Sequence, residues 1–270
     1  MLVYVLVAVL GCAAFLYPFF LPAAALPDSS HSGDAPLVAA LVGALVVVAV
    51  LLEVRRGSMT VATIAMLGVL SAACGLLRIL DLPGGGNGIF FLIILAGAAF
   101  GPRFGLLLGL CSMAVGAILT GGIGPWLPFQ MLALGAMGAA AGVVGRWTEA
   151  RPMPVQAWSL AALGWVWGFL YGAIMNLWFW PFTRTGDQLS WQPGLGAGDT
   201  LHRYWSFYVA TSFAWDAAGA LANAVIILLT AAVLLPSLRR FAHRLAPTVI
   251  FERHDAPGPS PLAAASPRAP

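Results

Sequence analysis

Long apolar runs, separated by short polar or glycine- and proline-containing breaks, fill most of this chain. A helix needs about 20 predominantly apolar residues to cross the hydrocarbon core of a bilayer, so runs of this length predict membrane-spanning helices. The eight predicted spans cover residues 2–23, 36–52, 59–79, 88–101, 104–120, 126–145, 157–181 and 206–236. The pattern therefore predicts an all-α, polytopic membrane helix bundle.

Two breaks interrupt the apolar stretch from Phe100 to Gln130, and each predicts a helical hairpin. The uncharged run 104–145 is about twice as long as one span, and TGGIGPW within it contains the residues of a turn. The second break is GPR, where Pro102 cannot continue the preceding helix. Gly101 and Gly105 allow two helices to approach each other closely at this point.

Composition excludes a soluble domain, because 60% of the residues are hydrophobic and only 9% are charged. A soluble domain carries about 25% charged residues. All 13 basic residues are arginines, and they lie between apolar spans without forming a patch, so we expect no nucleic-acid partner. Cys12, Cys74 and Cys111 lie in apolar spans without CxxC spacing, which predicts neither a disulfide nor a metal site.

The arginines also predict the orientation of the bundle. If the Arg55–Arg56 end is cytoplasmic, ten arginines fall on the cytoplasmic side and three on the outer side, as the positive-inside rule requires. We therefore expect a multi-pass protein of the plasma membrane with a cytoplasmic C-terminus. PAAALP at 22–27 resembles a signal-peptide cleavage site, so removal of the first span is an alternative to an extra helix.

Polar side chains inside predicted spans are the candidates for function, because they are expensive in a membrane. Ser212, Asp216 and Asn223 share one helical face in the last span, and Tyr208 extends that face outward. A substrate-facing stripe and a set of helix–helix contacts, with Asp216 paired to another helix or to Ser212, are both open interpretations. The residues predicted to bind substrate are Asn87, Trp126, Gln130, Tyr171, Asn176, Tyr208, Ser212 and Asp216.

Other polar and aromatic residues have simpler interpretations. Arg78 and Asp81 lie three residues apart and are expected to pair with each other. Trp180 and Trp191 are interpreted as part of an aromatic belt at the membrane surface. The sequence contains no HExxH, GxSxG or P-loop motif, so we expect neither catalytic residues nor a cofactor. A membrane enzyme that uses Asp216 with His202 is a remote alternative, and a packing protein without transport is another.

Several stretches of the sequence resemble a known family of membrane proteins. The stretches "MLGVLSAACGLLRIL", "FGPRFGLLLG", "LTGGIGPWLPFQM", "LALGAMGAAAGVVGR", "FLYGAIMNLWFWPF" and "RYWSFYVATSFAWDAAGA" look like the substrate-binding S component of energy-coupling factor (ECF) transporters. The resemblance covers about residues 59–240 and is strongest to actinobacterial members near the cobalamin-specific S component. It implies a six-helix core at 57–242, two extra N-terminal helices at 1–56 and a disordered cytoplasmic tail at 243–270.

The resemblance also implies partners and a ligand. An S component captures a vitamin at its outer face, works with a transmembrane T component and two ABC ATPase subunits, and is surrounded by membrane lipid. Cobalamin or a related corrinoid is the first expectation, and another small vitamin or a modified base is the alternative. The family docks through small residues of its first core helix. The strict AxxxA motif is missing here, and Ala65, Gly68 and Ala72 are the matching candidates.

Overall fold

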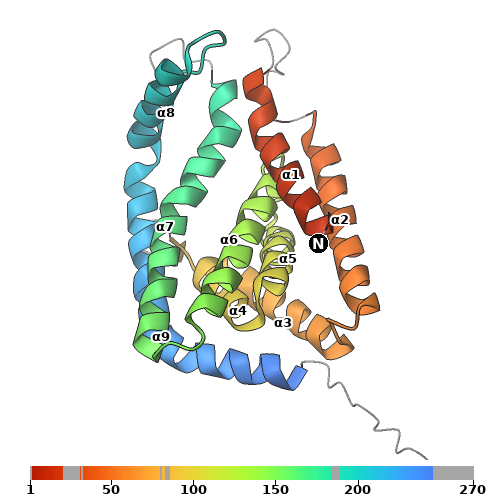
Figure 1. The fold of residues 1–270 in the computed structure, drawn as a ribbon. Coiled ribbons are helices and arrows are strands. Elements are labelled where there is room, and N and C mark those ends of the chain that lie inside the picture. The colour runs from red at the N-terminus through yellow and green to blue at the C-terminus, as the bar shows by residue number, and fades with distance from the viewer. Residues whose placement is uncertain are drawn as a thin grey trace, which may run out of the picture.

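The computed structural model describes residues 2–20, 31, 33–79, 81–82, 86–183 and 189–245. These residues confirm the predicted all-α helix bundle (Figure 1). The helices in chain order are α1 (Leu2–Leu16), the 3-10 turn η1 (Tyr17–Phe20), α2 (Ala35–Arg55), α3 (Val61–Leu77), α4 (Ile89–Phe100), α5 (Pro102–Thr120), α6 (Leu127–Thr148), α7 (Met153–Phe179), η3 (Trp180–Phe182), α8 (Ala197–Thr211) and α9 (Phe213–Leu245). Between α3 and α4, β1 (Asp81–Leu82) and β2 (Gly86–Asn87) form a minimal antiparallel pair.

Within the described part of the chain, six helices are long and apolar enough to cross a membrane, namely α1 with η1, α2, α5, α6, α7 and α9. The helices α3 and α4 are apolar but shorter. The protein is therefore a multi-pass membrane protein. Both predicted hairpins are present, since α5 begins at Pro102 and α6 begins at Leu127, directly after the TGGIGPW segment.

The predicted last span, residues 206–236, is wrong in its bounds. The structure has a break at Ser212 between α8 and α9, and α9 continues past Pro236 to Leu245. Thr211 Oγ1 donates to the carbonyl oxygen of Phe207 at 2.8 Å, a back-bond of the kind that bends helices. As a result, Asp216 lies in the first turn of α9 rather than ten residues into an unbroken span. The end of α9 runs beneath the other helices (Figure 1) and overlaps the first three residues of the predicted tail.

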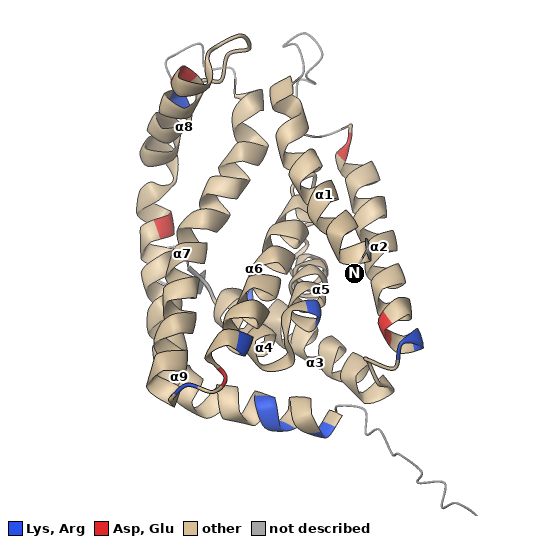
Figure 2. Cartoon of the chain, in the orientation of Figure 1, with Lys and Arg blue, Asp and Glu red and all other residues tan. Residues whose placement is uncertain are grey.

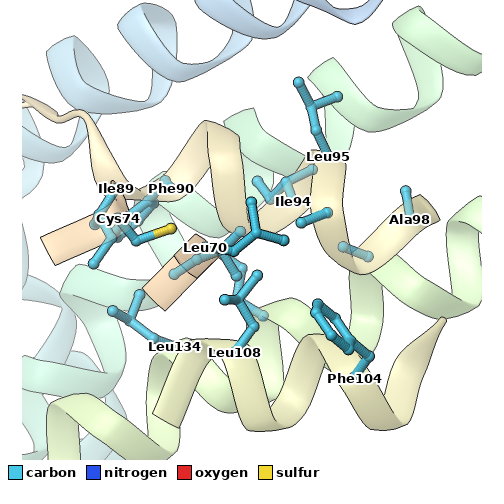
Figure 3. Close-up of a cluster of buried hydrophobic side chains, with 14 of the residues drawn as sticks. Leu70, Cys74, Ile89, Phe90, Ile94, Leu95, Ala98, Phe104, Leu108 and Leu134 are labelled. Carbon is cyan, nitrogen blue, oxygen red and sulfur yellow. The ribbon is translucent and has the colours of Figure 1, made fainter. Parts of the chain in front are cut away.

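A buried apolar cluster joins α3, α4, α5 and α6 (Figure 3). Leu70 and Cys74 of α3 lie beside Ile89 and Phe90 of α4, and Leu108 of α5 lies beneath them. These side chains are at most 8% exposed. Burial of an aliphatic side chain of this size stabilises a soluble protein by about 1.5–3 kcal/mol. In lipid, close packing between helices takes over this role.

Small residues bring α4, α5 and α6 into backbone contact. A Cβ atom built on Gly105 of α5 would lie 2.1 Å from the carbonyl oxygen of Gly138 of α6. The reverse distance, from a Cβ on Gly138 to the carbonyl oxygen of Gly105, is 2.0 Å. Gly97 of α4 faces the same carbonyl of Gly138 at 2.5 Å. The close approach predicted at Gly105 is confirmed, whereas Gly101, at φ +92°, is the turn residue between α4 and α5.

A second set of glycines joins α7 to α9. Gly164, Gly168 and Gly172 recur every four residues, so they lie on one face of α7. Cβ atoms built on Gly164 and Gly168 would meet Ile227 and Ala220 of α9 at 2.6 Å. This repeat allows α7 and α9 to pack at close range along several turns.

Two polar or aromatic clusters attach α1 and α2 to the rest of the bundle. At one end, the buried Glu53 accepts hydrogen bonds from Tyr4 of α1 at 2.9 Å and from Ser58. Its Oε2 also lies 3.2 Å from Nη1 of Arg103 of α5. At the other end, His31 is fully buried. Its ring contacts the side chains of Phe129, Trp178 and Phe182 and those of Tyr17 and Asp34.

Candidate functional site

Two hollows in the structure differ in character. The larger, of about 900 Å³, is an open groove between α1 and the α5–α6 pair, and apolar side chains line most of it. The smaller, of about 260 Å³, lies among α3, α4, α5, α6, α7 and α9, and we call it the central cavity. It is lined by Arg78, Ile89, Phe90, Met113, Gln130, Leu134, Gly168, Tyr171, Trp215, Asp216, Gly219 and Asn223. Convergent polar groups in an otherwise apolar hollow are typical of ligand sites, so the central cavity is the candidate site.

Four of the described residues that line the central cavity each have a buried polar atom without a hydrogen-bond partner. These atoms are Arg78 Nη1, Gln130 Oε1, Asp216 Oδ2 and Asn223 Oδ1. A buried polar group without a partner costs about 1–3 kcal/mol, and more when it is charged. In a membrane bundle such a cluster is a candidate for a site where a bound molecule completes the hydrogen bonds.

Arg78 enters the cavity because two glycines leave room for its long side chain. It forms the C-cap of α3, so its position is fixed by the end of that helix. A Cβ atom on Gly116 of α5 would lie 2.9 Å from Arg78 Cδ, and one on Gly122 would lie 3.4 Å from Nη2. The predicted partner of Arg78, the side chain of Asp81, lies outside the described residues. Sequence reasoning missed the contribution of Arg78 to the site, although it is one of only three arginines assigned to the outer side.

Asp216 of α9 reaches the cavity beside Gly172 of α7. A Cβ atom on Gly172 would lie 1.8 Å from Asp216 Oδ2, so only a glycine at this position leaves space for the carboxylate. Asn223, seven residues further along α9, lines the same cavity and is 2% exposed. The face predicted for the last span therefore points into the cavity at Asp216 and Asn223.

Gln130 and Tyr171 approach the cavity from α6 and α7. The ring of Tyr171 packs edge to face against Phe90 of α4, with 5.1 Å between the ring centroids. Gln130 lies one turn into α6, which begins after the TGGIGPW turn. The structure thus brings together three of the predicted site residues, namely Gln130, Tyr171 and Asp216.

The other predicted site residues lie elsewhere. Asn176 Nδ2 donates to Ser212 Oγ at 2.8 Å, and Ser212 donates to Asn176 Oδ1 at 3.1 Å, so these two side chains join α7 to the α8–α9 break. Tyr208 donates to the carbonyl oxygen of Phe169 at 3.5 Å and lies within hydrogen-bonding reach of the Asp216 carboxylate, although it does not itself line the central cavity. Trp126 is 39% exposed, and its ring lies over Gly124. The backbone of Asn87 pairs with Asp81, and its side chain lies outside the described residues.

Two further interpretations change with the structure. Trp180 is 1% exposed, and its Nε1 donates to the carbonyl oxygen of Leu189 at 2.7 Å, so its interpretation as a belt residue is wrong. The Trp180 ring also contacts the rings of Phe19 of η1 and Tyr204 of α8. His202 is exposed on α8 and does not line the central cavity with Asp216, so the structure does not assemble the pair that the enzyme alternative needs.

The small residues of α3 face away from the bundle. Ala65, Gly68 and Ala72 are all exposed, and a Cβ atom on Gly68 would have nothing within 4 Å. Val69 and Leu76 beside them are 64% and 58% exposed. These residues therefore do not serve packing within this chain.

These features define a class of protein: a polytopic membrane bundle with a small cavity between its helices, where four of the described residues each have a buried polar atom without a hydrogen-bond partner. The chain matches the family model of the ECF transporter substrate-specific component over residues 59–231, and it belongs to this family. The match begins just before α3 and leaves α1 and α2 outside it. No curated protein and no solved structure gives a significant match.

Proposed function

We propose that this protein captures a small organic nutrient in its central cavity as the substrate-binding subunit of an ECF importer. ECF substrate-specific components are transporter subunits that work with a T component and ATPases. The observation that carries the proposal is the set of four buried polar atoms around the central cavity that have no hydrogen-bond partner among the described residues. A ligand supplies the missing partners, and this gain is large where lipid excludes water.

The size of the cavity favours the smaller of the two expected ligand classes. Drug-sized ligands occupy clefts of about 300–1,000 Å³. The central cavity measures about 260 Å³, which suits a single small ring system and is too small for a corrinoid. We therefore propose a small vitamin, a modified base or a compound of similar size as the transported ligand.

The distribution of charge supports the proposed orientation. Figure 2 shows the basic residues gathered mainly at the end of the bundle where the last part of α9 runs beneath the other helices. By the positive-inside rule we propose that this end is cytoplasmic and that the C-terminus lies inside the cell. The opposite end, with α8 and the turn between α5 and α6, then faces the exterior from which the nutrient enters.

The exposed face of α3 is the proposed contact with the T component. Small side chains allow the backbones of two membrane helices to approach closely, and van der Waals contact then replaces the absent hydrophobic drive. Ala65, Gly68 and Ala72 offer such a surface.

The experiment that tests the proposed function is native mass spectrometry of the detergent-purified protein after equilibration with an extract of small metabolites. We expect one small molecule per chain, and a loss of at least about tenfold in retained ligand for Gln130→Leu, which removes a polar partner. Gln192→Leu, at an exposed position of the outer loop, is the matched control. A wild-type protein that retains no small molecule would overturn the proposal.

A further inference from the structure

We infer that the ligand is a small aromatic molecule with an anionic or carbonyl oxygen at one end and an amino-type N–H donor at the other. This inference rests on the proposed function and names the chemical class of its substrate. Its basis is the placement of one guanidinium group and one carboxylate around the same small cavity.

The two charged groups lie against different walls. The Arg78 guanidinium rests against α5, where a Cβ atom on Gly116 would be 3.6 Å from Nη1. The Asp216 carboxylate rests against α7, at Gly172. Among the described residues no ion pair joins Arg78 to Asp216. A ligand between the walls can therefore contact both groups at once.

The chemistry of the two groups fixes what each end of the ligand offers. A guanidinium has only donors and stays charged, so Arg78 Nη1 requires an acceptor, and an anionic oxygen gives the stronger bond. A carboxylate oxygen accepts, so Asp216 Oδ2 requires an N–H or O–H donor, and a cationic or amidine-like nitrogen gives the stronger bond. A neutral apolar ligand would leave Arg78 Nη1 and Asp216 Oδ2 buried without hydrogen-bond partners, which is unfavourable.

The two amide side chains of the cavity do not restrict the chemical class of the ligand further. Gln130 and Asn223 each carry both a donor and an acceptor and can rotate to match either. They can bind the edge of a ring between the two charged ends. The charged pair, rather than the amides, therefore selects the ligand class.

The remaining walls select a flat molecule. Phe90, Tyr171 and Trp215 contribute aromatic rings to a cavity of about 260 Å³. Aromatic side chains pack well against another ring, in stacked or edge-to-face geometry. A ligand with one aromatic ring and two polar ends can pack against the aromatic side chains, bond to the two amides and pair with both charged groups.

The test compares three probes of nearly equal size by isothermal titration calorimetry on the purified full chain: 4-(aminomethyl)benzoate, benzylamine and 4-methylbenzoate. The first carries both charged ends, and each of the others carries one. We expect the first to bind at least about tenfold more tightly than either of the others, since a hydrogen bond to a charged group contributes about 1.5–3 kcal/mol. Equal affinity for the three probes would overturn the inference.

Two variants test which side chain binds which end of the ligand. Arg78→Gln should remove the advantage of 4-(aminomethyl)benzoate over benzylamine, and Asp216→Asn should remove its advantage over 4-methylbenzoate. Arg151→Gln and Asp199→Asn, at exposed positions outside the cavity, are the matched controls and should leave both ratios unchanged. Loss of affinity for all probes in equal measure would contradict the assignment of ends.

The molecule retained in native mass spectrometry separates the inference from the proposed function. A retained compound with both an acidic or carbonyl oxygen and an amino-type nitrogen supports both. A retained compound that lacks either group overturns the inference and leaves the transporter function standing. A protein that retains no compound and binds none of the three probes overturns the proposed function, and the inference with it.

Discussion

The carboxylate of Asp216 of α9 lies directly against the backbone of Gly172 of α7. Gly172→Ala would place a methyl group 1.8 Å from the present position of Asp216 Oδ2 and so displace the carboxylate. We expect ligand affinity to fall at least about tenfold, the loss of one hydrogen bond to a charged group. Calorimetry with 4-(aminomethyl)benzoate measures it. Gly43→Ala, where a Cβ has nothing within 4 Å, is the control, and an unchanged affinity in Gly172→Ala would contradict the prediction.

Gly138→Ala tests the three-helix contact of α4, α5 and α6. The added methyl group would lie 2.0 Å from the carbonyl oxygen of Gly105, and backbone atoms cannot move away as a flexible side chain can. Overpacking of this kind costs about 1–3 kcal/mol. We expect a lower unfolding temperature in detergent, whereas Gly43→Ala should be neutral. Equal melting of the two variants would show that the contact is relaxed at little cost.

Glu53→Ala tests how α1 and α2 are attached. The change leaves Tyr4, Ser58 and Arg103 without their common acceptor. Because the Arg103 side chain is 50% exposed, its ion pair is screened, and we expect a total loss of about 1–3 kcal/mol. Thermal unfolding in detergent measures this loss. Glu149→Ala, on an exposed carboxylate, should have no such effect, and an equal effect would argue against a specific role for Glu53.

His31 predicts a pH dependence. Burial lowers the pKa of its imidazole below the ordinary value, against the opposite effect of Asp34. The unfolded chain then binds more protons just below about pH 6.5, so stability is complete above that pH and falls below it by up to about 1.4 kcal/mol per pH unit. Melting temperatures at about pH 7.5 and about pH 5.5, on either side of the ordinary pKa, measure the effect.

The controls replace the imidazole of His31 and the neighbouring carboxylate of Asp34 in turn. His31→Phe keeps an aromatic ring among Phe129, Trp178 and Phe182 and should lose most of the pH dependence. Asp34→Asn separates the contribution of the neighbouring carboxylate. If His31→Phe melts with the same pH dependence as the wild type, another group is responsible.

Gly68→Phe tests the proposed docking face of α3. The position is exposed and a Cβ there has nothing within 4 Å, so a larger side chain fits the isolated chain. We expect co-purification of the T component to fall severalfold while ligand binding stays unchanged, because a ring keeps the partner helix at a distance. Gly43→Phe on α2 is the matched control. Normal complex formation by Gly68→Phe would show that the T component does not contact α3 at this position.

The pattern of apolar residues predicts the helices well, because lipid demands long uninterrupted apolar stretches. The limits of α5 and α6 follow from Pro102 and from the TGGIGPW turn. The break at Ser212 is not visible in that pattern, because the residues on both sides of it are apolar enough for one span.

The site was predictable only in part. Depth and polarity identify Asp216 and Gln130, but they cannot tell a ligand contact from a helix contact. Asn176 and Ser212 satisfy one another across 36 positions of sequence, and only the packing of α7 shows it. The surroundings of Arg78 include Gly116 of α5 and Gly122 of the turn that follows α5, and neither contact is visible in the sequence near Arg78.

The two ends of α3 both lie close to α9 or to the cavity that α9 lines. At one end, the hydroxyls of Thr60 and Thr63 donate to the carbonyl oxygen of Leu245, the last residue of α9, at 3.3 and 3.4 Å. At the other end, Arg78 of α3 and Asp216 of α9 face the same cavity. A ligand bound to both charged groups would link α3 and α9 at this second end as well. The proposed docking face of α3 would then belong to a helix that is held at both of its ends. A partner that contacts only α3 would then meet a more rigid helix when the ligand is bound than when the cavity is empty.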